Sequence, residues 1–178
     1  MRFIFLLSAL LVFQTAKAAD FDERMEKAKQ GNATAQFWLG HIYSIGKGVP
    51  RNDREAVKWY AKAAAQGNVS AQFQLGLMYD GGRGVPENDA EAVKWYREAA
   101  GHGHRTAQNF LGLMYATGEG VPVNVILAYV WWSMAKTQGD TFAEMKINEL
   151  KPQITRQQIA KAQSLAAKCY ESDYKDCD

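Results

Sequence analysis

Three glycines at a spacing of 36 residues, Gly40, Gly76 and Gly112, mark an internal repeat that constrains the fold of this chain. The residues around each glycine recur with it: an Ala-Gln pair shortly before, a leucine directly before, and a Gly-Val-Pro run after it. A repeat of this length is typical of solenoids, in which each unit buries its apolar face against its neighbours. We therefore expect an all-α solenoid, which offers an extended binding surface rather than one enclosed pocket.

Within the first copy, residues 32–67, the spacing of apolar residues predicts two helices joined by a turn. Apolar side chains lie at helical spacing from Ala35 to Tyr43. Residues 44–52 are rich in glycine and contain a proline, which indicates a turn. Asn52 and Glu55 form a capping pattern at the start of a second amphipathic helix. Each copy is therefore predicted to be an antiparallel helix pair.

The repeated glycine lies inside the first predicted helix of each copy, where it is costly. Glycine in a helix costs about 0.5–1 kcal/mol relative to alanine. Its recurrence predicts a shared steric need, namely an approach of the partner helix so close that no Cβ fits. The aromatic pair Trp59 and Tyr60 on the second helix, with its counterparts, would fill the wider gaps.

The repeats divide the chain into consecutive segments. We predict repeats over 32–67, 68–103 and 104–139, a partial fourth over 140–150, an N-terminal capping helix over 19–31, and a C-terminal capping helix and tail over 151–178. Thr155 and Gln158 form a capping box at the start of the final helix. We expect residues 19–178 to form one domain.

Residues 1–18 have the pattern of a cleaved signal peptide. Arg2 precedes a short apolar run, and Ala16-Lys17-Ala18 fits cleavage after Ala18. The apolar run is shorter than a membrane-spanning helix needs. Without Arg2 and Lys17, the chain has equal numbers of basic and acidic residues. A neutral chain lacks the basic patch that nucleic-acid binding requires, and no stable membrane insertion is expected after cleavage.

The two cysteines, Cys169 and Cys177, both lie near the C-terminus. In an exported protein we expect this pair to form a disulfide that fastens the tail to the last helix. The alternatives are less favoured, because a metal site needs more ligands nearby and catalytic redox pairs use a shorter spacing.

The pattern A-Q-x-x-L-G-x-x-Y-x-x-G-x-G-V-P-x-N, followed by A-V-K-W-Y-x-x-A-A, resembles the Sel-1-like repeat family. Residues 71–100 fit throughout, and the third copy departs at Leu127 and Trp132. The resemblance implies a right-handed superhelix of helix pairs related to tetratricopeptide repeats. It also implies an adaptor role in assembly, envelope signalling or host contact, in a protein that is periplasmic or secreted from bacteria.

One cysteine-rich exported branch of this family is associated with penicillin binding and weak β-lactamase activity. That branch carries a cysteine pair in each repeat, which this chain lacks. Ser133 and Lys136 match S-x-x-K, the acylating motif of penicillin-recognising enzymes, but neither companion motif is present. We therefore predict no catalytic residues and keep a cell-wall or β-lactam binding protein with weak β-lactamase activity as the alternative.

No metal or cofactor is expected. His102 and His104 flank Gly103 in a predicted inter-repeat loop, and no third ligand is evident, whereas zinc requires three or four. We expect both histidines to be solvated loop residues.

By the same resemblance, the first helix of each pair lines the concave face of the solenoid. The predicted partner-binding residues are Phe37, His41, Phe73, Leu77, Asp80, Asn109 and Leu113. Phe37 and Phe73 could equally pack between repeats, so both interpretations stay open. The leading hypothesis is a non-enzymatic, monomeric interaction module that binds a peptide or protein segment on this face, since exposed apolar stripes usually mark binding sites.

Overall fold

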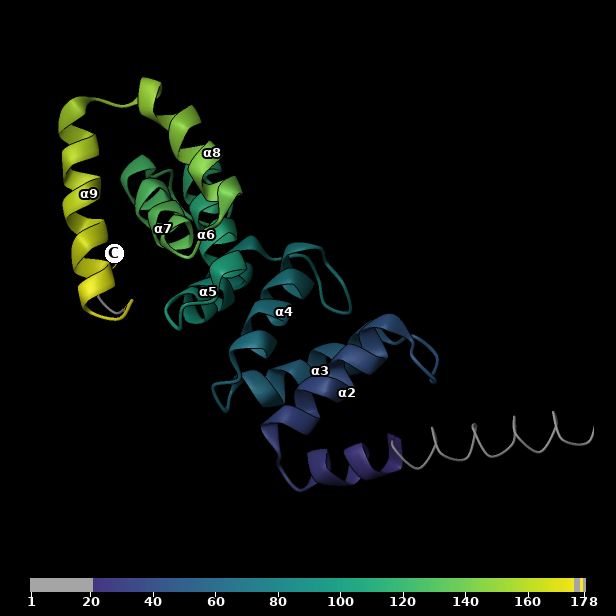
Figure 1. Cartoon of the computed structure of the whole chain (residues 1–178). Coiled ribbons are helices and arrows are strands. Elements are labelled where there is room, and N and C mark those ends of the chain that lie inside the picture. Colours follow the sequence, from purple (N-terminus) through teal and green to yellow (C-terminus); the bar gives the residue numbers. More distant parts are fainter. Residues whose placement is uncertain (1–20, 175–176, 178) are drawn as a thin grey trace, which may run out of the picture. The chain divides into compact units, whose positions relative to one another are not determined.

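The computed structural model describes residues 21–174 and 177, so the predicted signal peptide lies outside the described residues. Every regular element in this part of the chain is a helix (Figure 1). The chain divides into two compact units, Met1–Ala71 and Gln72–Asp178, which are described separately. The prediction of one continuous domain over residues 19–178 stays a prediction.

The first unit contains a helical segment over residues 21–29, α2 (Ala33–Ile45) and α3 (Asp53–Ala64). Its core consists of Ala28, Ala35, Leu39 and Trp59, against which Phe21, Met25, Ile42 and Tyr43 pack. The side chain of Asn32 caps α2, and the side chain of Asn52 caps α3, as its sequence pattern predicted. Residues 21–29 therefore cover one side of the first helix pair.

The repeated glycine is a point of close helix contact in every copy. A Cβ on Gly40 would lie 2.5 Å from the Tyr60 ring of α3, closer than side-chain carbons pack. In the second unit, Gly76 of α4 (Val69–Asp80) faces Tyr96 of α5 (Asp89–Ala100) at 2.6 Å. The predicted steric need is confirmed, because no side chain fits between these helices.

The third copy keeps this contact with a different aromatic residue. It consists of α6 (Arg105–Thr117) and α7 (Val125–Thr137). A Cβ on Gly112 would lie 2.6 Å from Nε1 of Trp132. Trp132 donates that N–H to the backbone oxygen of Asn109 at 3.2 Å, so the larger ring keeps its polar atom paired when buried.

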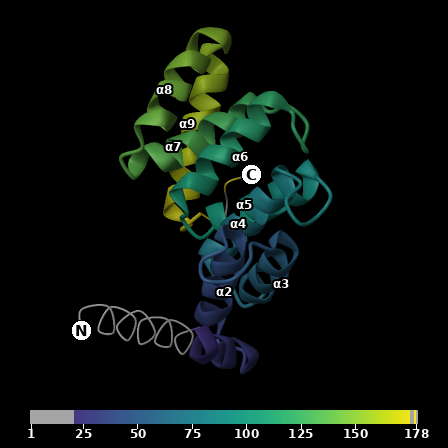
Figure 2. The ribbon, with the colours of Figure 1, turned by 90° about the vertical axis from the view of Figure 1, so that its right-hand side faces the viewer.

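Two further helices pack against α7 and close the second unit (Figures 1 and 2). They are α8 (Thr141–Leu150) and α9 (Arg156–Glu171), joined through a short 3-10 turn, η1 (Lys151–Gln153). Thr155 and Gln158 form the capping box predicted at the start of α9.

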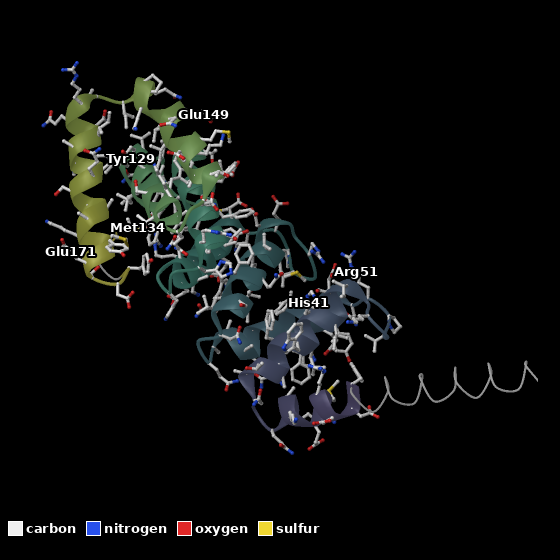
Figure 3. The ribbon with its side chains drawn as sticks, in the orientation of Figure 1. His41, Arg51, Tyr129, Met134, Glu149 and Glu171 are labelled. Carbon is white, nitrogen blue, oxygen red and sulfur yellow. A yellow bond between two sulfur atoms is a disulfide. The ribbon has the colours of Figure 1, made fainter. Side chains whose placement is uncertain are left out.

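Figure 3 labels side chains on these three helices. Tyr129 and Met134 on α7 are buried, whereas Glu149 on α8 and Glu171 on α9 are exposed. None of the helices in the described part of the chain is long and apolar enough to cross a membrane.

The predicted disulfide joins Cys169, on the last turn of α9, to Cys177. The backbone after α9 turns back on the helix end, where the amide of Tyr174 donates to the carbonyl of Cys169 at 2.8 Å. The Tyr174 ring then lies 3.2 Å from the position that a Cβ on Gly103 would take. The tail therefore contacts the loop between α5 and α6, in addition to the helix to which the disulfide fastens it.

Buried glutamines link the ends of successive helices. Gln36 donates from its side-chain amide to the backbone oxygen of Ala28 and accepts from Gln66 at 2.6 Å. In the third copy, Gln108 accepts in the same way from Gln138 at 2.9 Å. Each buried amide is thus paired on both its donor and its acceptor side.

The second copy lacks the glutamine that donates to the buried amide oxygen in the other two copies. His102 stands where Gln66 and Gln138 stand in the other copies, and its Nδ1 lies 2.8 Å from the backbone oxygen of Glu98 instead. Gln72 is only 4% exposed, and its side-chain oxygen has no hydrogen-bond partner among the described residues. A buried acceptor without a donor costs stability.

Candidate partner-binding surface

An aromatic cluster in the second unit connects α4, α5 and α6. The ring of Phe73 stacks on His104, with 4.6 Å between ring centroids, and meets the edge of Phe110 at 5.8 Å. Tyr96 packs against both phenylalanines, and its ring centroid lies 5.8 Å from that of Phe73 and 5.1 Å from that of Phe110. Tyr96 is fully buried, whereas Phe73 and Phe110 stay partly accessible. The cluster therefore has a sealed base and an accessible apolar top.

The accessible top continues along both first helices. Leu77 follows Phe73 by one helical turn on α4, and Leu113 follows Phe110 by about one turn on α6. Both leucines are partly buried. We call Phe73, Leu77, Phe110 and Leu113 the apolar face of the second unit.

A carboxylate stands beside this face at the C-terminal end of α4. The hydroxyl of Tyr96 donates to Oδ2 of Asp80 at 3.0 Å. Burial, and then the negative charge of Asp80, raise the pKa of Tyr96 well above its ordinary value. Tyr96 therefore keeps its proton and holds the Asp80 carboxylate in place.

His104 is a structural residue of the cluster rather than a solvated loop residue, so that prediction was wrong for it. Its Nδ1 accepts the amide of Ala107 at 3.2 Å and caps α6, a role that Asn32 and Asn68 have in the preceding copies. Burial lowers the pKa of His104. His102, by contrast, is exposed as expected.

Asn109 differs most from its predicted place on the partner-binding face. Its side chain is 8% exposed, and its side-chain oxygen is buried without a hydrogen-bond partner among the described residues. The position corresponds to Phe37 and Phe73, which pack on the tyrosine of their own copy. In the third copy the tryptophan at that site covers this position, so Asn109 is not carried into the proposal below.

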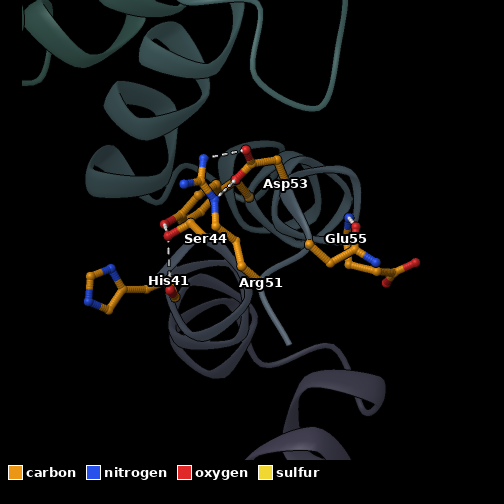
Figure 4. Close-up of polar contacts among 7 residues, drawn as sticks. His41, Ser44, Arg51, Asp53 and Glu55 are labelled. Carbon is orange, nitrogen blue, oxygen red and sulfur yellow. Dashed lines mark hydrogen bonds and ion pairs between the residues drawn. The ribbon is translucent and has the colours of Figure 1, made fainter. Parts of the chain in front are cut away.

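The first unit presents a smaller aromatic group on α2. The ring centroid of Phe37 lies 5.9 Å from that of Tyr60 and 5.5 Å from that of Trp38. Trp38 is 43% exposed. The rings of Trp38 and His41 form a T-shaped pair, with 5.8 Å between their centroids. In Figure 4 the His41 imidazole points away from the Arg51–Asp53 ion pair and the other labelled side chains. His41 is therefore partly accessible beside an exposed indole, and its role in partner binding stays a prediction.

Phe37 and Phe73 combine the two interpretations that the sequence left open. Each packs on the tyrosine of its own copy, and Phe73 also contacts His104 and Phe110 of the next. Each also keeps part of its surface accessible. Trp38 and Phe110 were not among the predicted residues; they occupy the same repeat position, one residue beyond Phe37 and Asn109. The 3.6-residue period of the helix brings both positions to one side.

The lysine of the S-x-x-K match forms an ion pair on the surface. Nζ of Lys136 lies 2.8 Å from Glu144, and this hydrogen bond and charge raise the pKa of Lys136. A lysine that serves as a general base needs a lowered pKa, which is the opposite shift. Among residues 21–174 and 177, no group of three or more His, Cys, Asp and Glu side chains could hold a metal ion. Nothing in this part of the chain points to catalysis.

Comparison with known families finds the Sel1 repeat at residues 33–68, 69–104 and 106–140. These boundaries lie within two residues of the predicted repeats. Sel1 repeats are generally protein–protein interaction modules.

Solved structures of bacterial proteins share the fold. A Sel1 repeat protein from Oxalobacter formigenes is 37% identical, with a TM-score of 0.68, over 73% of this chain and 98% of that one. The protective antigen c5321 of uropathogenic Escherichia coli, which displays an SLR fold, is 33% identical with a TM-score of 0.75. That match covers 88% of this chain but 34% of the antigen. The predicted fold class, an all-α solenoid of helix pairs, is confirmed.

Two further matches are more limited. Helicobacter pylori cysteine rich protein B is 23% identical over 66% of this chain with a TM-score of 0.54, which shows a common fold alone. The chitin synthase regulator SKT5 of Saccharomyces cerevisiae is 42% identical over 60 residues, and the matched stretch spans 34% of this chain and 9% of the yeast protein.

Proposed function

The chain belongs to the Sel1 repeat family, and from this premise we propose that it is a non-enzymatic module that binds a protein segment in the bacterial cell envelope. The contact surface in the second unit is the apolar face, with Asp80 at its edge. The accessible top of the aromatic cluster carries this proposal, because partly exposed Phe73 and Phe110 pack on a buried Tyr96.

A rigid apolar face suits a protein partner because it binds with little loss of side-chain freedom. The rings of Phe73 and Phe110 pack on each other and on Tyr96, so we expect a partner to order them at little cost. Trp38 and His41 offer a second accessible aromatic group on the first unit. Both groups lie on first helices, where the sequence predicted the partner-binding residues.

Export from the cytoplasm is part of the proposal. The Cys169–Cys177 disulfide supports it, since such bonds persist in oxidising compartments. The signal-peptide pattern of residues 1–18 points the same way. Fractionation of cells that make the full chain, with thiol alkylation before and after reduction, tests it. Export predicts an oxidised protein shortened at its N-terminus in the periplasm or medium, and a reduced, full-length protein in the cytoplasm would contradict it.

The partner-binding role is tested by crosslinking in the native cell followed by mass spectrometry. The test variant is Phe73→Ala with Leu77→Ala, and the matched control is Tyr170→Ala, which removes a 61% exposed aromatic ring from α9. Circular dichroism establishes that all three proteins fold. We expect a crosslinked protein to be captured by the wild type and the control and lost from the double variant. Equal capture by all three would move the site away from this face.

A further inference from the structure

We propose that the apolar face selects a protein segment carrying an arginine or lysine, whose cationic group pairs with Asp80 while its neighbours pack on Phe73 and Leu77. This inference rests on the proposed function and specifies the chemistry of the partner. It starts from the position of Asp80, the last residue of α4. The C-terminal end of a helix carries a partial negative charge, which adds to that of the carboxylate.

The hydrogen bond from Tyr96 holds the Asp80 carboxylate in place and leaves its negative charge uncompensated. The tyrosine hydroxyl donates one hydrogen bond to Oδ2 and brings no positive charge. Because the pKa of Tyr96 is raised, this donor keeps its proton at physiological pH. A carboxylate can accept several hydrogen bonds through its two oxygens, so acceptor capacity remains for a partner.

Asp80 differs in its ionic contacts from two paired carboxylates of the same unit, Glu91 and Glu144. Glu91 pairs with Lys94, and Glu144 pairs with Lys136. Within the described residues, no lysine, arginine or histidine pairs with Asp80, and its side chain accepts a hydrogen bond from the neutral Tyr96 hydroxyl. Asp80 is partly buried at the edge of an apolar face, where a carboxylate gains more from a cation than it would in bulk water.

The other two copies lack this charge. Ser44 occupies the corresponding position on α2, and its hydroxyl lies 3.3 Å from the Tyr60 hydroxyl. Ala116 occupies it on α6. The negative site is therefore a property of the second copy and not a requirement of the repeat fold.

An arginine or lysine side chain matches both parts of this surface. Its methylene stem packs on apolar groups while the charged end reaches a polar atom. A guanidinium also pairs with a carboxylate through two parallel hydrogen bonds and stacks on aromatic rings. A partner segment with an apolar residue beside the cation would cover Phe73 and Leu77 at the same time.

The experiment is an NMR titration of the ¹⁵N-labelled mature chain with two acetylated, amidated peptides of sequence Gly-Leu-Arg-Phe-Gly and Gly-Leu-citrulline-Phe-Gly. Citrulline keeps the shape of arginine and removes its charge. The test variant is Asp80→Asn, which keeps an acceptor for Tyr96. The matched control is Glu98→Gln, which removes an exposed carboxylate from α5.

We expect the arginine peptide to bind the wild type and Glu98→Gln about fivefold more tightly than the citrulline peptide, the order of a partly shielded ion pair. In Asp80→Asn the two peptides should bind alike. Equal behaviour of the two peptides on the wild type, including no detectable shift from either, overturns the proposal. So does discrimination that survives in Asp80→Asn.

Two further outcomes separate this inference from the proposed function. Acetyl-arginine amide alone should give no comparable shifts at the same concentration, because an equal response would mean that the face binds small cations rather than a protein segment. A crosslinked partner that is lost from Phe73→Ala with Leu77→Ala but retained by Asp80→Asn would leave the proposed function standing and overturn the role of Asp80.

Discussion

In the second and third copies of the repeat, different aromatic residues pack against the recurring position of the helix glycine. In the second copy Tyr96 fills the gap over Gly76, and its hydroxyl points outward to Asp80. In the third copy Trp132 fills the gap over Gly112, and its N–H points inward to a backbone oxygen. The helix contact is the same, but one copy presents a carboxylate at its surface and the other does not.

This difference separates two kinds of position in the repeat. The glycine and the aromatic ring above it set the distance between the helices, so they determine stability. The polar atom of that ring, and the residue that it meets, determine what the surface offers to a partner. Substitutions of the first kind should change the free energy of unfolding strongly, and those of the second kind should change it little.

The largest loss in the free energy of unfolding is expected for Gly76→Ala. The added Cβ would lie 2.6 Å from the Tyr96 ring, so the two helices must move apart. Overpacking costs about 1–3 kcal/mol, which exceeds the gain in helix propensity from alanine. Urea denaturation measures the change. Gly81→Ala is the control, because its Cβ would meet no atom closer than 3.4 Å, and an equal loss in both variants would contradict the steric explanation.

A smaller effect is expected for Tyr96→Phe, which keeps the ring over Gly76 and removes the hydroxyl. We expect a loss of about 1 kcal/mol in the free energy of unfolding, because a hydrogen bond to a carboxylate disappears. A double-mutant cycle with Asp80→Ala isolates the pair. A coupling energy near zero would show that the Tyr96–Asp80 hydrogen bond contributes nothing to stability.

The glutamine arrangement predicts a stabilising substitution in the second copy. His102→Gln places an amide donor where Gln66 and Gln138 stand, within reach of the unpaired oxygen of Gln72. We expect a gain of about 0.5–1 kcal/mol in thermal or urea denaturation. The reverse change, Gln138→His, should cost a similar amount in the third copy. A stability that does not change in either variant would show that water satisfies this oxygen equally well.

The smallest effect concerns the pH dependence of stability at His104. Burial lowers the pKa of this histidine in the folded state, so the unfolded chain binds the proton more readily. Stability should therefore fall as the pH decreases below about 6.5, the ordinary pKa of histidine. His104→Asn, which keeps a helix cap of the kind seen at Asn68, should lose less stability between pH 7 and pH 5. Parallel pH profiles for the two proteins would exclude this role.

The sequence predicted the helix pairs, the close contact at Gly40, the caps at Asn52 and Thr155 and the disulfide, because these depend on local spacing and on the repeat. It did not predict that His104 caps a helix, since a histidine in that place departs from the asparagine of the other copies. It also did not predict the burial of Asn109, which follows from the size of the ring at position 132 of the partner helix. Local patterns thus determined the frame, whereas the surface depended on which side chains meet across helices.

The position of α9 on α7 has a consequence for how chains of this kind vary in length. Because α9 packs on α7, its contact lies on the third copy and does not depend on how many helix pairs precede that copy. We therefore expect that a 36-residue block can be added or removed upstream of residue 104 while the contact between α7 and α9 is kept. On this expectation, the number of repeats changes independently of the segment that packs on the last one.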